Sequence, residues 1–516
     1  MLTKRTEPDV LSEFETDESG LFHARDLQAV YFPETETDVA RGLEEAGQAG
    51  LPVTLSGAGT GINGGRVAVE GGVVLSARDL RSPLTPCGET VTLEQFGQQF
   101  AIHVDEEAAE AVVPAGLSLE LLDKMLPEAL IYPPDPTELS AFCSATIATN
   151  ASGARTFRYG PTRDWVLGLR VVLPNGDILA VDRGQYAAAE GALRFTGASG
   201  RSYEVPVPTY EMPQVKNAAG LYAAPDMDLV DLFVGSEGLL GVITESKVRL
   251  APRPENLVSQ IAFFEEETAA LGFVDDMRTA GLSGAMEVLS LEFFDQNSIG
   301  FMEHPLTEGK EYTAAYVEVC GEVDELEPLL EALETHGCVE DWFAETPEDQ
   351  REQKEFRHLL PEGINSYLRR QGSLKLGTDL VVPAHKFADM LAAYHEAGEQ
   401  FAARFPREGK HYLMFGHIGN YHLHVNFITH TEDERRAARG LYAELARLAI
   451  ECGGTISGEH GVGKKTIAID GKALPYLELM YGKEGLLQIA RAKKALDPAL
   501  LLNVGNMVPR EYLLEV

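Results

Sequence analysis

The chain has little cysteine, no long apolar run and few basic residues for its length. Its cysteines are odd in number and far apart, and no C-x-x-C pair occurs. This spacing excludes an iron–sulfur cluster or a cysteine-bound structural zinc, and it is typical of buried thiols in a reducing compartment. No apolar run reaches the roughly 18 residues of a membrane span, and none follows the basic residues of the N-terminus. We therefore expect a soluble, cytoplasmic protein with no transmembrane segment. The cysteines are Cys87, Cys143, Cys320, Cys338 and Cys452.

Basic residues are outnumbered by acidic ones. Lys and Arg total 43 against 80 Asp and Glu, a formal net charge of −37. Such a surface repels phosphate backbones and anionic lipid headgroups, which argues against nucleic acid and membrane surfaces as partners. An anionic substrate would have to be attracted by a local basic patch.

The length of 516 residues is too great for one hydrophobic core, and the pattern of short apolar runs, glycine-rich turns and helices indicates an α+β protein. A helix is predicted over 36–49 with Val39, Leu43 and Ala46 on one face. The composition shifts near Pro252 and Pro254. We expect one domain over 1–252, a cap-like second domain over 253–455, and a C-terminal segment over 456–516.

The stretch "SGAGTGINGG" contains Gly59, Gly61 and Gly64, which satisfy G-x-G-x-x-G after a predicted strand. A dinucleotide fingerprint requires a helix to open at this loop, whereas "RVAVEGGVVLS" follows and reads as a strand, so a Rossmann fold is disfavoured. The loop still offers successive backbone N–H groups to a diphosphate, with a plain surface hairpin as the alternative. A second stretch, "GEHGVGKKT", lacks the Ser or Thr of a P-loop, which excludes an ATPase on this motif.

The stretch "MFGHIGNYHLHVNFITH" is rich in histidine. As a strand it places His422, His424 and Asn426 on one face, with Leu423, Val425 and Phe427 on the other, and His417 precedes a Gly-Asn turn. Imidazoles so placed suit a divalent ion such as zinc, although paired strand histidines are more often exposed or hydrogen-bonded. The stretch "SGEHGVG" adds Glu459 as a carboxylate and His460 as an acid/base group, which favours a three-ligand metal site.

Six ordered motifs resemble the FAD-linked oxidases of the vanillyl-alcohol-oxidase type, and within them the D-lactate, glycolate and D-2-hydroxyglutarate dehydrogenases. The resemblance spans about residues 25–510, and it implies a two-part FAD-binding domain and an α+β cap with a mainly antiparallel sheet. The motifs are "PVTLSGAGTGINGG", "YPPDPTELSAFCSATIATNASGARTFRYGPTRDWVLGLRVVLPNG", "DLFVGSEGLLGVITE", "FGHIGNYHLHVN", "GGTISGEHGVGKK" and "LLNVGNM".

The resemblance implies a set of FAD-binding positions. The pattern departs from the family at Ala58, where a loop glycine is usual, and at Ser144-Ala145, which replace Gly-Gly; all three side chains are small. No histidine lies in the loop to tether the flavin, which favours non-covalent FAD. The implied residues are Ser56, Gly57, Ala58, Gly59, Thr60, Gly61, Asn63, Gly64, Pro134, Asp135, Ser144, Ala145, Asn150, Gly153, Glu237, Gly241, Ile243 and Asn503.

The resemblance also implies that His417, His424 and Glu459 bind a divalent metal, zinc first, while Asn426 and His460 contact substrate. The usual H-x-G-D-G-N-x-H pattern is altered, because Asn420, Tyr421 and His422 occupy its middle positions; whether His422 joins the metal stays open. Arg357 and Lys375 match the family's carboxylate binders, and an Arg fork suits a carboxylate geometrically.

The function these residues predict is oxidation of a D-2-hydroxy acid to the 2-oxo acid by hydride transfer to flavin, with His460 as base. The electrons would pass to an external acceptor: a quinone, a cytochrome, an electron-transfer flavoprotein or an iron–sulfur subunit. A homodimer is compatible with this expectation. The alternatives are an aldonolactone or sugar-alcohol oxidase on the same fold, and a flavin subunit of a larger redox complex.

Overall fold

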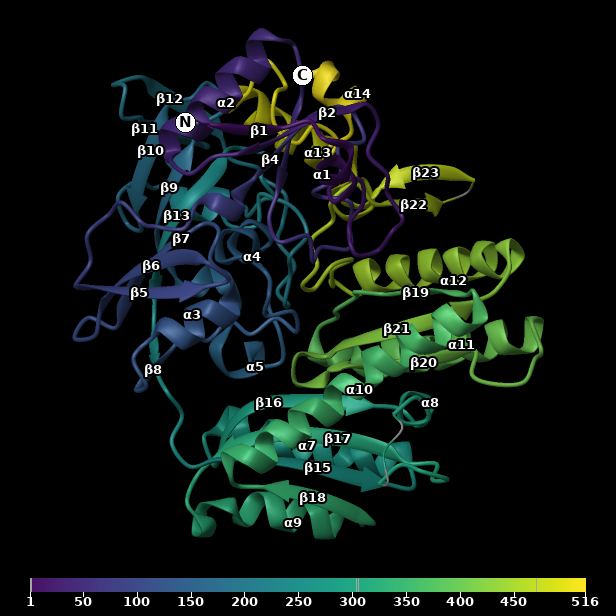
Figure 1. Cartoon of the computed structure of the whole chain (residues 1–516). Coiled ribbons are helices and arrows are strands. Elements are labelled where there is room, and N and C mark those ends of the chain that lie inside the picture. The colour runs from purple at the N-terminus through teal and green to yellow at the C-terminus, as the bar shows by residue number, and fades with distance from the viewer. Residues whose placement is uncertain (1, 303, 305, 470) are drawn as a thin grey trace.

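The computed structural model describes every residue except 1, 303, 305 and 470. Two bodies are visible in Figure 1: sheets of the first half of the chain lie above, and a large sheet from the middle of the chain lies below. The C-terminal segment returns to the upper body, beside the N-terminal strands. Segments far apart in sequence therefore meet where the two bodies face each other.

The first sheet of the upper body has four strands in the order β1-β2-β4-β3. Strands β2 and β3 each pair with β4 in parallel, and helix α2 (Glu36–Gln48) crosses between them. The predicted apolar face of α2 is confirmed, because Val39, Leu43 and Ala46 are buried, and the Thr35 side chain caps the helix by accepting from Asp38 N. The strands of this first sheet are β1 (Thr3–Arg5), β2 (Leu27–Phe32), β3 (Val53–Ser56) and β4 (Gly72–Ser76).

The second sheet has six strands in the order β10-β9-β13-β7-β6-β5, all paired antiparallel. Its strands are β5 (Glu89–Gln95), β6 (Gln98–Asp105), β7 (Glu110–Pro114), β9 (Val166–Val172), β10 (Ile178–Asp182) and β13 (Val242–Arg249). Around it lie α3 (Leu119–Met125), α4 (Cys143–Thr149), α5 (Thr156–Tyr159), α6 (Leu229–Phe233), the hairpin β11 (Ala192–Thr196) and β12 (Ser202–Pro206), and the short pair β8 (Leu130–Ile131) and β14 (Ala251–Pro252).

The lower body, here called the cap, is a seven-stranded antiparallel sheet in the order β18-β15-β17-β16-β20-β21-β19. Helix α10 packs on one face through Phe356, Leu360 and Ile364, which share a core with Ile428. The opposite face, with Leu423 and Phe427, joins the main core. The strands are β15 (Leu257–Phe264), β16 (Glu287–Phe294), β17 (Thr313–Cys320), β18 (Glu340–Ala344), β19 (Leu374–Gly377), β20 (Tyr412–His417) and β21 (His422–Thr429); the helices are α7 (Glu267–Ser283), α8 (Gln296–Ile299), α9 (Glu327–Thr335), α10 (Pro347–Gln371), α11 (Phe387–Arg404) and α12 (Glu432–Glu451).

The C-terminal segment forms a hairpin of β22 (Thr466–Ile469) and β23 (Lys472–Pro475), then α13 (Tyr476–Leu496) and α14 (Arg510–Glu515). Helix α13 is interrupted at Gly482, whose φ of 68° is non-helical. Among the described residues, no helix is long and apolar enough to cross a membrane.

Lys493 of α13 is fully buried and fixes the turn after the helix. Its Nζ donates to the carbonyl oxygens of Leu239 (2.6 Å) and Leu502 (2.8 Å) and to the Asp497 carboxylate. Asp497 in turn accepts from Leu502 N at 2.8 Å. This buried pair joins the C-terminal segment to the upper body directly beside Asn503, a predicted flavin residue.

Replacing Lys493 with Met should lower the free energy of unfolding by about 3–5 kcal/mol, because the Asp497 charge loses its buried partner. The measurement is denaturant unfolding of the purified protein. Lys483→Met is the matched control, since Lys483 pairs with Glu515 at the surface and its loss should cost far less than the loss of Lys493. Equal costs for the two variants would contradict the structural role of Lys493.

Candidate active site

A cleft of about 970 Å³ opens at the glycine-rich loop that follows β3. The loop stays irregular and leads into β4 without a helix, as the sequence predicted. Gly57 lies so close to α4 that a Cβ placed there would be 2.8 Å from the Cβ of Ala145. The loop and the helix therefore form a narrow wall only because position 57 is glycine.

Two asparagines hold the cleft together. Asn503 accepts a hydrogen bond from Leu55 N (2.7 Å) and donates to the carbonyl oxygen of Glu237 (2.8 Å), so it joins β3 to the turn before β13. Asn63 donates to the carbonyl oxygen of His460 at 2.6 Å. The backbone of His460 is thus fixed against the glycine-rich loop.

Most of the predicted FAD-binding residues line this cleft. His460 lies in the same wall. The lining set includes Ser56, Gly57, Ala58, Gly59, Thr60, Gly61, Asn63, Ser144, Ala145, Glu237, Gly241, Ile243 and Asn503; Gly64, Pro134, Asp135, Asn150 and Gly153 are outside it, and Asp17, Arg66, Thr149 and Asn506 belong to it without having been predicted. Asn150 instead donates to the Asn217 carbonyl oxygen at 3.2 Å and accepts from Arg163 N at 2.9 Å.

Glu237, at a φ of 50°, turns its carboxylate away from solvent. The carboxylate accepts from Val462 N (2.7 Å) and Gly463 N (2.8 Å). Burial raises the pKa of Glu237 to about 7. The two hydrogen bonds attach the "GEHGVG" turn to the wall of the cleft.

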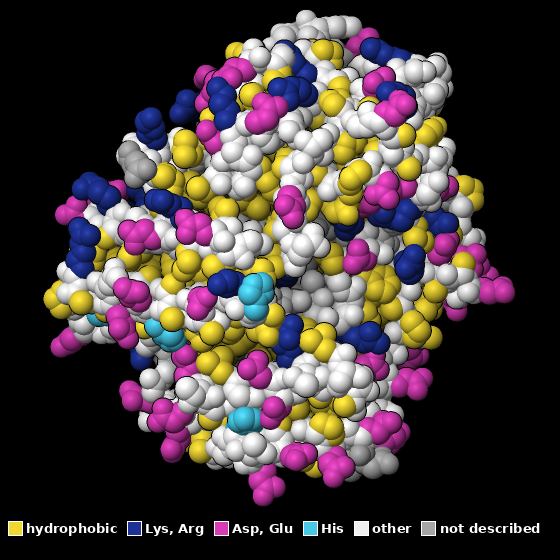
Figure 2. Space-filling model, turned by 180° about the vertical axis from the view of Figure 1, so that it is seen from behind, with side chains coloured by type: hydrophobic (Ala, Val, Ile, Leu, Met, Phe, Trp, Pro, Cys, Tyr) yellow, Lys and Arg dark blue, Asp and Glu magenta, His cyan; other side chains and the backbone are white. Residues whose placement is uncertain are grey.

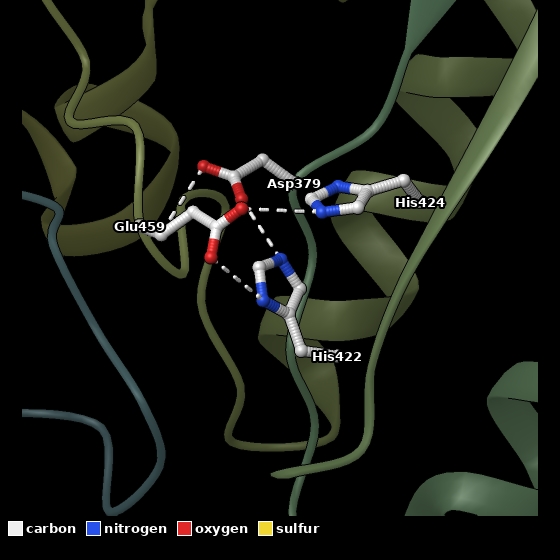
Figure 3. A group of neighbouring side chains, drawn as sticks. All are labelled: Asp379, His422, His424 and Glu459. Carbon is white, nitrogen blue, oxygen red and sulfur yellow. Dashed lines mark hydrogen bonds and ion pairs between the residues drawn. The ribbon is translucent and has the colours of Figure 1, made fainter. Parts of the chain in front are cut away.

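A group of four side chains that could hold a metal ion lies beside the cleft: Asp379, His422, His424 and Glu459, with ligand atoms within 4.8 Å of one another (Figure 3). His422 and His424 point from β21 to the same side, as the strand alternation predicted. Glu459 comes from the loop after α12, and Asp379 follows β19. Asp379, His422 and His424 are buried, and only 10% of the Glu459 side chain is exposed.

Each strand histidine has an outer partner that leaves its other nitrogen free for a cation. His424 Nδ1 is 2.9 Å from the Thr378 carbonyl oxygen, and its Nε2 is 3.2 Å from Glu459 Oε1. His422 Nε2 is 2.8 Å from Asp379 Oδ1, and its Nδ1, which lacks a hydrogen bond within the described structure, is 3.7 Å from Glu459 Oε2. Outer carbonyl and carboxylate partners of this kind fix the tautomer of metal-binding histidines.

His417, at the end of β20, lies outside the four-residue group but contacts the same carboxylate. Its Nε2 is 3.3 Å from Glu459 Oε2, and its Nδ1 is 3.3 Å from Glu292 Oε1. Glu292 was not predicted, although a carboxylate inside the apolar strand "VLSLEFF" is itself a signal of a special position.

Arg357 of α10 is paired with Glu292. Its Nε is 3.0 Å from Glu292 Oε2, its Nη2 contacts Oε1, and the guanidinium lies 4.6 Å from the centre of the Tyr316 ring. The predicted carboxylate anchor is therefore linked through Glu292 to His417. Its Nη1 has no hydrogen bond among the described residues.

The protonation states of the group differ. Burial, together with the nearby Lys216 and His424, lowers the pKa of His422 to about 3, so this ring is neutral. Burial alone would lower the pKa of His417, but the Glu459 and Glu292 carboxylates together outweigh it and raise this pKa to about 9. Burial opposes ionisation of Glu459, yet Lys216 and His417 hold its pKa well below the usual range.

His460 joins the cleft to this group. Its Nδ1 is 3.1 Å from Asp379 Oδ2, and its Nε2 is 3.5 Å from Glu459 Oε1. Asp379 also accepts from Ser457 Oγ at 2.6 Å and from the backbone N of His460 at 3.1 Å. Asp379 was missed as a site residue, because only the folded chain brings it to His422 and His460.

The two other predicted substrate residues lie on neighbouring strands. Asn426 is buried in β21 opposite Gly377, and Lys375 pairs with Ile428 two positions further along. Lys375 is exposed and shares the face of the sheet that carries His424 and Asn426. Acidic side chains are scattered over the face shown in Figure 2, and several Lys and Arg side chains lie near its middle.

The family of the chain follows from two domain matches. Residues 27–182 match the FAD binding domain, and residues 253–507 match the C-terminal domain of FAD linked oxidases. The chain is 31% identical over 493 residues to the glycolate oxidase subunit GlcD of Bacillus subtilis, covering 94% of this chain and 89% of that protein. The chain belongs to the FAD-linked oxidases.

Within that family the chain falls in the D-lactate, glycolate and D-2-hydroxyglutarate dehydrogenase group, as predicted. It is 28% identical to a D-lactate dehydrogenase of Archaeoglobus fulgidus (92% of this chain, 90% of that one) and 28% identical to a D-2-hydroxyglutarate dehydrogenase of Xanthomonas citri pv. viticola (98% and 94%). It is thus an FAD-linked oxidoreductase.

The predicted fold is also confirmed. A 4-ethylphenol oxidase from Gulosibacter chungangensis superposes with a TM-score of 0.63 at 16% identity, covering 98% of this chain and 95% of that one. An alkyldihydroxyacetonephosphate synthase superposes with a TM-score of 0.66 at 15% identity, covering 98% and 82%. At these identities the likeness concerns the architecture alone.

The raised pKa of His417 predicts a pH dependence of stability for the metal-free protein. A folded-state pKa of about 9 against 6.5 gives stabilisation that is complete below pH 6.5 and lost as the pH rises through 9. We expect the free energy of unfolding to fall by up to about 3 kcal/mol more in the wild type than in His417→Asn over this window. Denaturant unfolding in the presence of chelator measures the difference. Parallel pH profiles for the two proteins would contradict the assignment.

Proposed function

We propose that the chain is an FAD-dependent dehydrogenase that oxidises a D-2-hydroxy acid of the D-lactate type to the 2-oxo acid by hydride transfer to non-covalently bound FAD. The observation that carries the proposal is the position of His460, which lines the glycine-rich cleft and contacts both Glu459 and Asp379. An acid/base group between a dinucleotide cleft and a metal-binding group suits alcohol oxidation.

The residues of the cleft fit FAD. The glycine at position 57 permits the close approach of loop and helix, and Asn63 Oδ1 is buried without a hydrogen bond among the described residues. Successive backbone N–H groups of the loop suit a diphosphate, and no histidine or cysteine in it offers a covalent link. Bound FAD supplies the hydride acceptor.

The buried histidines fit a divalent metal. His417, His424 and Glu459 form the proposed ligand set. Nδ1 of the neutral His422 ring is buried and has no hydrogen bond among the described residues, so its lone pair can serve as a further metal ligand. Two or three imidazoles with one carboxylate suit zinc. A divalent ion held there would supply Lewis acidity toward the hydroxyl of the substrate.

The chain's own side chains then have separate tasks. Arg357, with Lys375 and Asn426 on the same side of the cap sheet, binds the carboxylate of the substrate. His460 accepts the hydroxyl proton at Nε2, while Asp379 holds its Nδ1 and stabilises the imidazolium. The buried surroundings exclude water and strengthen these contacts.

The electron acceptor is external. The five cysteines are free in the structure and provide no cluster ligands. A quinone, a cytochrome, an electron-transfer flavoprotein or an iron–sulfur subunit remain the candidate acceptors. The relative named as a glycolate oxidase subunit supports a second role, as the flavin subunit of a larger redox complex.

Adding a D-2-hydroxy acid to the purified protein without oxygen should bleach the flavin absorbance, and D-lactate should act faster than L-lactate. His460→Ala should keep FAD but slow bleaching by about 10²–10⁴-fold, the usual contribution of a general base. His430→Ala is the control, since His430 lies outside the site. Undiminished bleaching in His460→Ala would refute the assigned role.

Metal removal separates this function from an aldonolactone or sugar-alcohol oxidase. Dialysis against a chelator should leave the FAD spectrum intact but slow substrate bleaching at least about tenfold, and added zinc or manganese should restore it. His424→Ala should remain slow after metal addition, because a ligand is lost. Bleaching that is indifferent to chelator would favour the metal-independent alternative.

A further inference from the structure

Lys216 is a buried cation in the centre that neither sequence pattern nor resemblance predicted. It lies in residues 207–228, which connect β12 to α6 without a helix or strand. Its Nζ is 2.7 Å from Glu459 Oε2, and only 2% of its side chain is exposed. The ammonium thus sits against the carboxylate proposed to bind metal.

The oxygen that Lys216 contacts is the one that faces two imidazoles. Glu459 Oε2 is 3.3 Å from His417 Nε2 and 3.7 Å from His422 Nδ1. A divalent ion bound to this oxygen would lie close to the ammonium, and two cations in a buried space repel each other strongly. In the present geometry the ammonium of Lys216 neutralises the Glu459 carboxylate. A divalent ion and this ammonium could not both contact Glu459 Oε2 without repelling each other.

We propose that Lys216 is the built-in counter-ion of the metal-free centre: it competes with the divalent ion for Glu459 Oε2 and withdraws when the ion binds. This inference rests on the metal centre of the proposed function. It gives the chain a stable metal-free state, since a buried carboxylate without any cation is costly.

The structure provides room for the withdrawal. A second cavity of about 1680 Å³, open to solvent, is lined by Lys216 itself and by Tyr210, Met212, Val215, Asn217 and Asn420. Asn420 belongs to the turn between His417 and His422, so this cavity borders the centre. The Lys216 side chain closes the wall between them.

The backbone next to Lys216 is held in place, so the side chain alone has to move. The Asn217 carbonyl oxygen accepts from Asn150 Nδ2 at 3.2 Å, and Ala218 N donates to the Ser457 carbonyl oxygen at 2.9 Å. A flexible four-carbon stem can swing the ammonium into the cavity, where water solvates it.

The test is calorimetric titration of zinc, and separately of manganese, into chelator-treated protein that retains FAD. Lys216→Met and Lys216→Gln should bind the ion at least about tenfold more tightly than the wild type, whereas Lys216→Arg, which keeps the charge, should bind within about threefold of it. Lys465→Met is the matched control: this half-buried lysine is close enough to affect the pKa of His460, but its side chain has no hydrogen bond or ion pair among the described residues.

A thermal melt of the same proteins gives a second readout. Metal-free Lys216→Met should unfold at a lower temperature than the wild type, and zinc should raise its midpoint by more than it raises that of the wild type. A merely structural role would lower the midpoint with and without zinc alike.

Three outcomes would overturn the inference. Equal tightening in Lys465→Met would assign the effect to net charge rather than to the contact with Glu459. Weaker binding in Lys216→Met and Lys216→Gln would mean that Lys216 positions Glu459 for the metal. Binding by the wild type without change in the Lys216 variants would overturn the inference alone, whereas no binding by any of the proteins would overturn the metal centre with it.

Discussion

A carboxylate removed from water must be surrounded by positive charge or hydrogen-bond donors. Glu459 is such a carboxylate, and it lies where the upper body, the cap and the C-terminal segment meet. Its partners come from separate segments: Lys216 from the upper body, and His417 and His424 from the cap sheet. Glu459 itself lies near the start of the C-terminal segment, in the loop after α12. One buried charge therefore links three parts of the chain.

The same principle extends away from the centre. Glu292 links His417 to Arg357, and the Arg357 guanidinium lies over Tyr316, whose hydroxyl donates to Glu318 at 3.0 Å. Glu318 of the cap is in turn bridged by Arg155 of the upper body through Nε (2.8 Å) and Nη2 (3.1 Å). Bidentate pairs of this kind are geometrically demanding, so the cap is oriented on the flavin part by charge as well as by apolar packing.

The sequence was most informative where function depends on local spacing. The apolar face of α2, the irregular glycine-rich loop and the alternation along β21 all follow from neighbouring residues, and all are present in the structure. Asp379 and Lys216 could not be found in this way, because their partners are distant in sequence: Lys216 and Glu459 are separated by 243 positions. Asn150, which a motif implied as a flavin residue, uses both ends of its amide within the protein, and sequence spacing gave no sign of these two hydrogen bonds.

Strand alternation places His422, His424 and Asn426 on one face, but their surroundings give each a different chemistry. Asp379 holds Nε2 of His422 and leaves Nδ1 toward Glu459, whereas the Thr378 carbonyl oxygen holds Nδ1 of His424 and leaves Nε2. The two rings thus present opposite nitrogens to the same carboxylate, and Asp379 also holds the base His460. Any shift of Asp379 would therefore disturb His422, a proposed metal donor, and His460, the proposed proton acceptor, together. In the proposed function, Asp379 thus acts through these two histidines, as the outer partners of metal-binding histidines do.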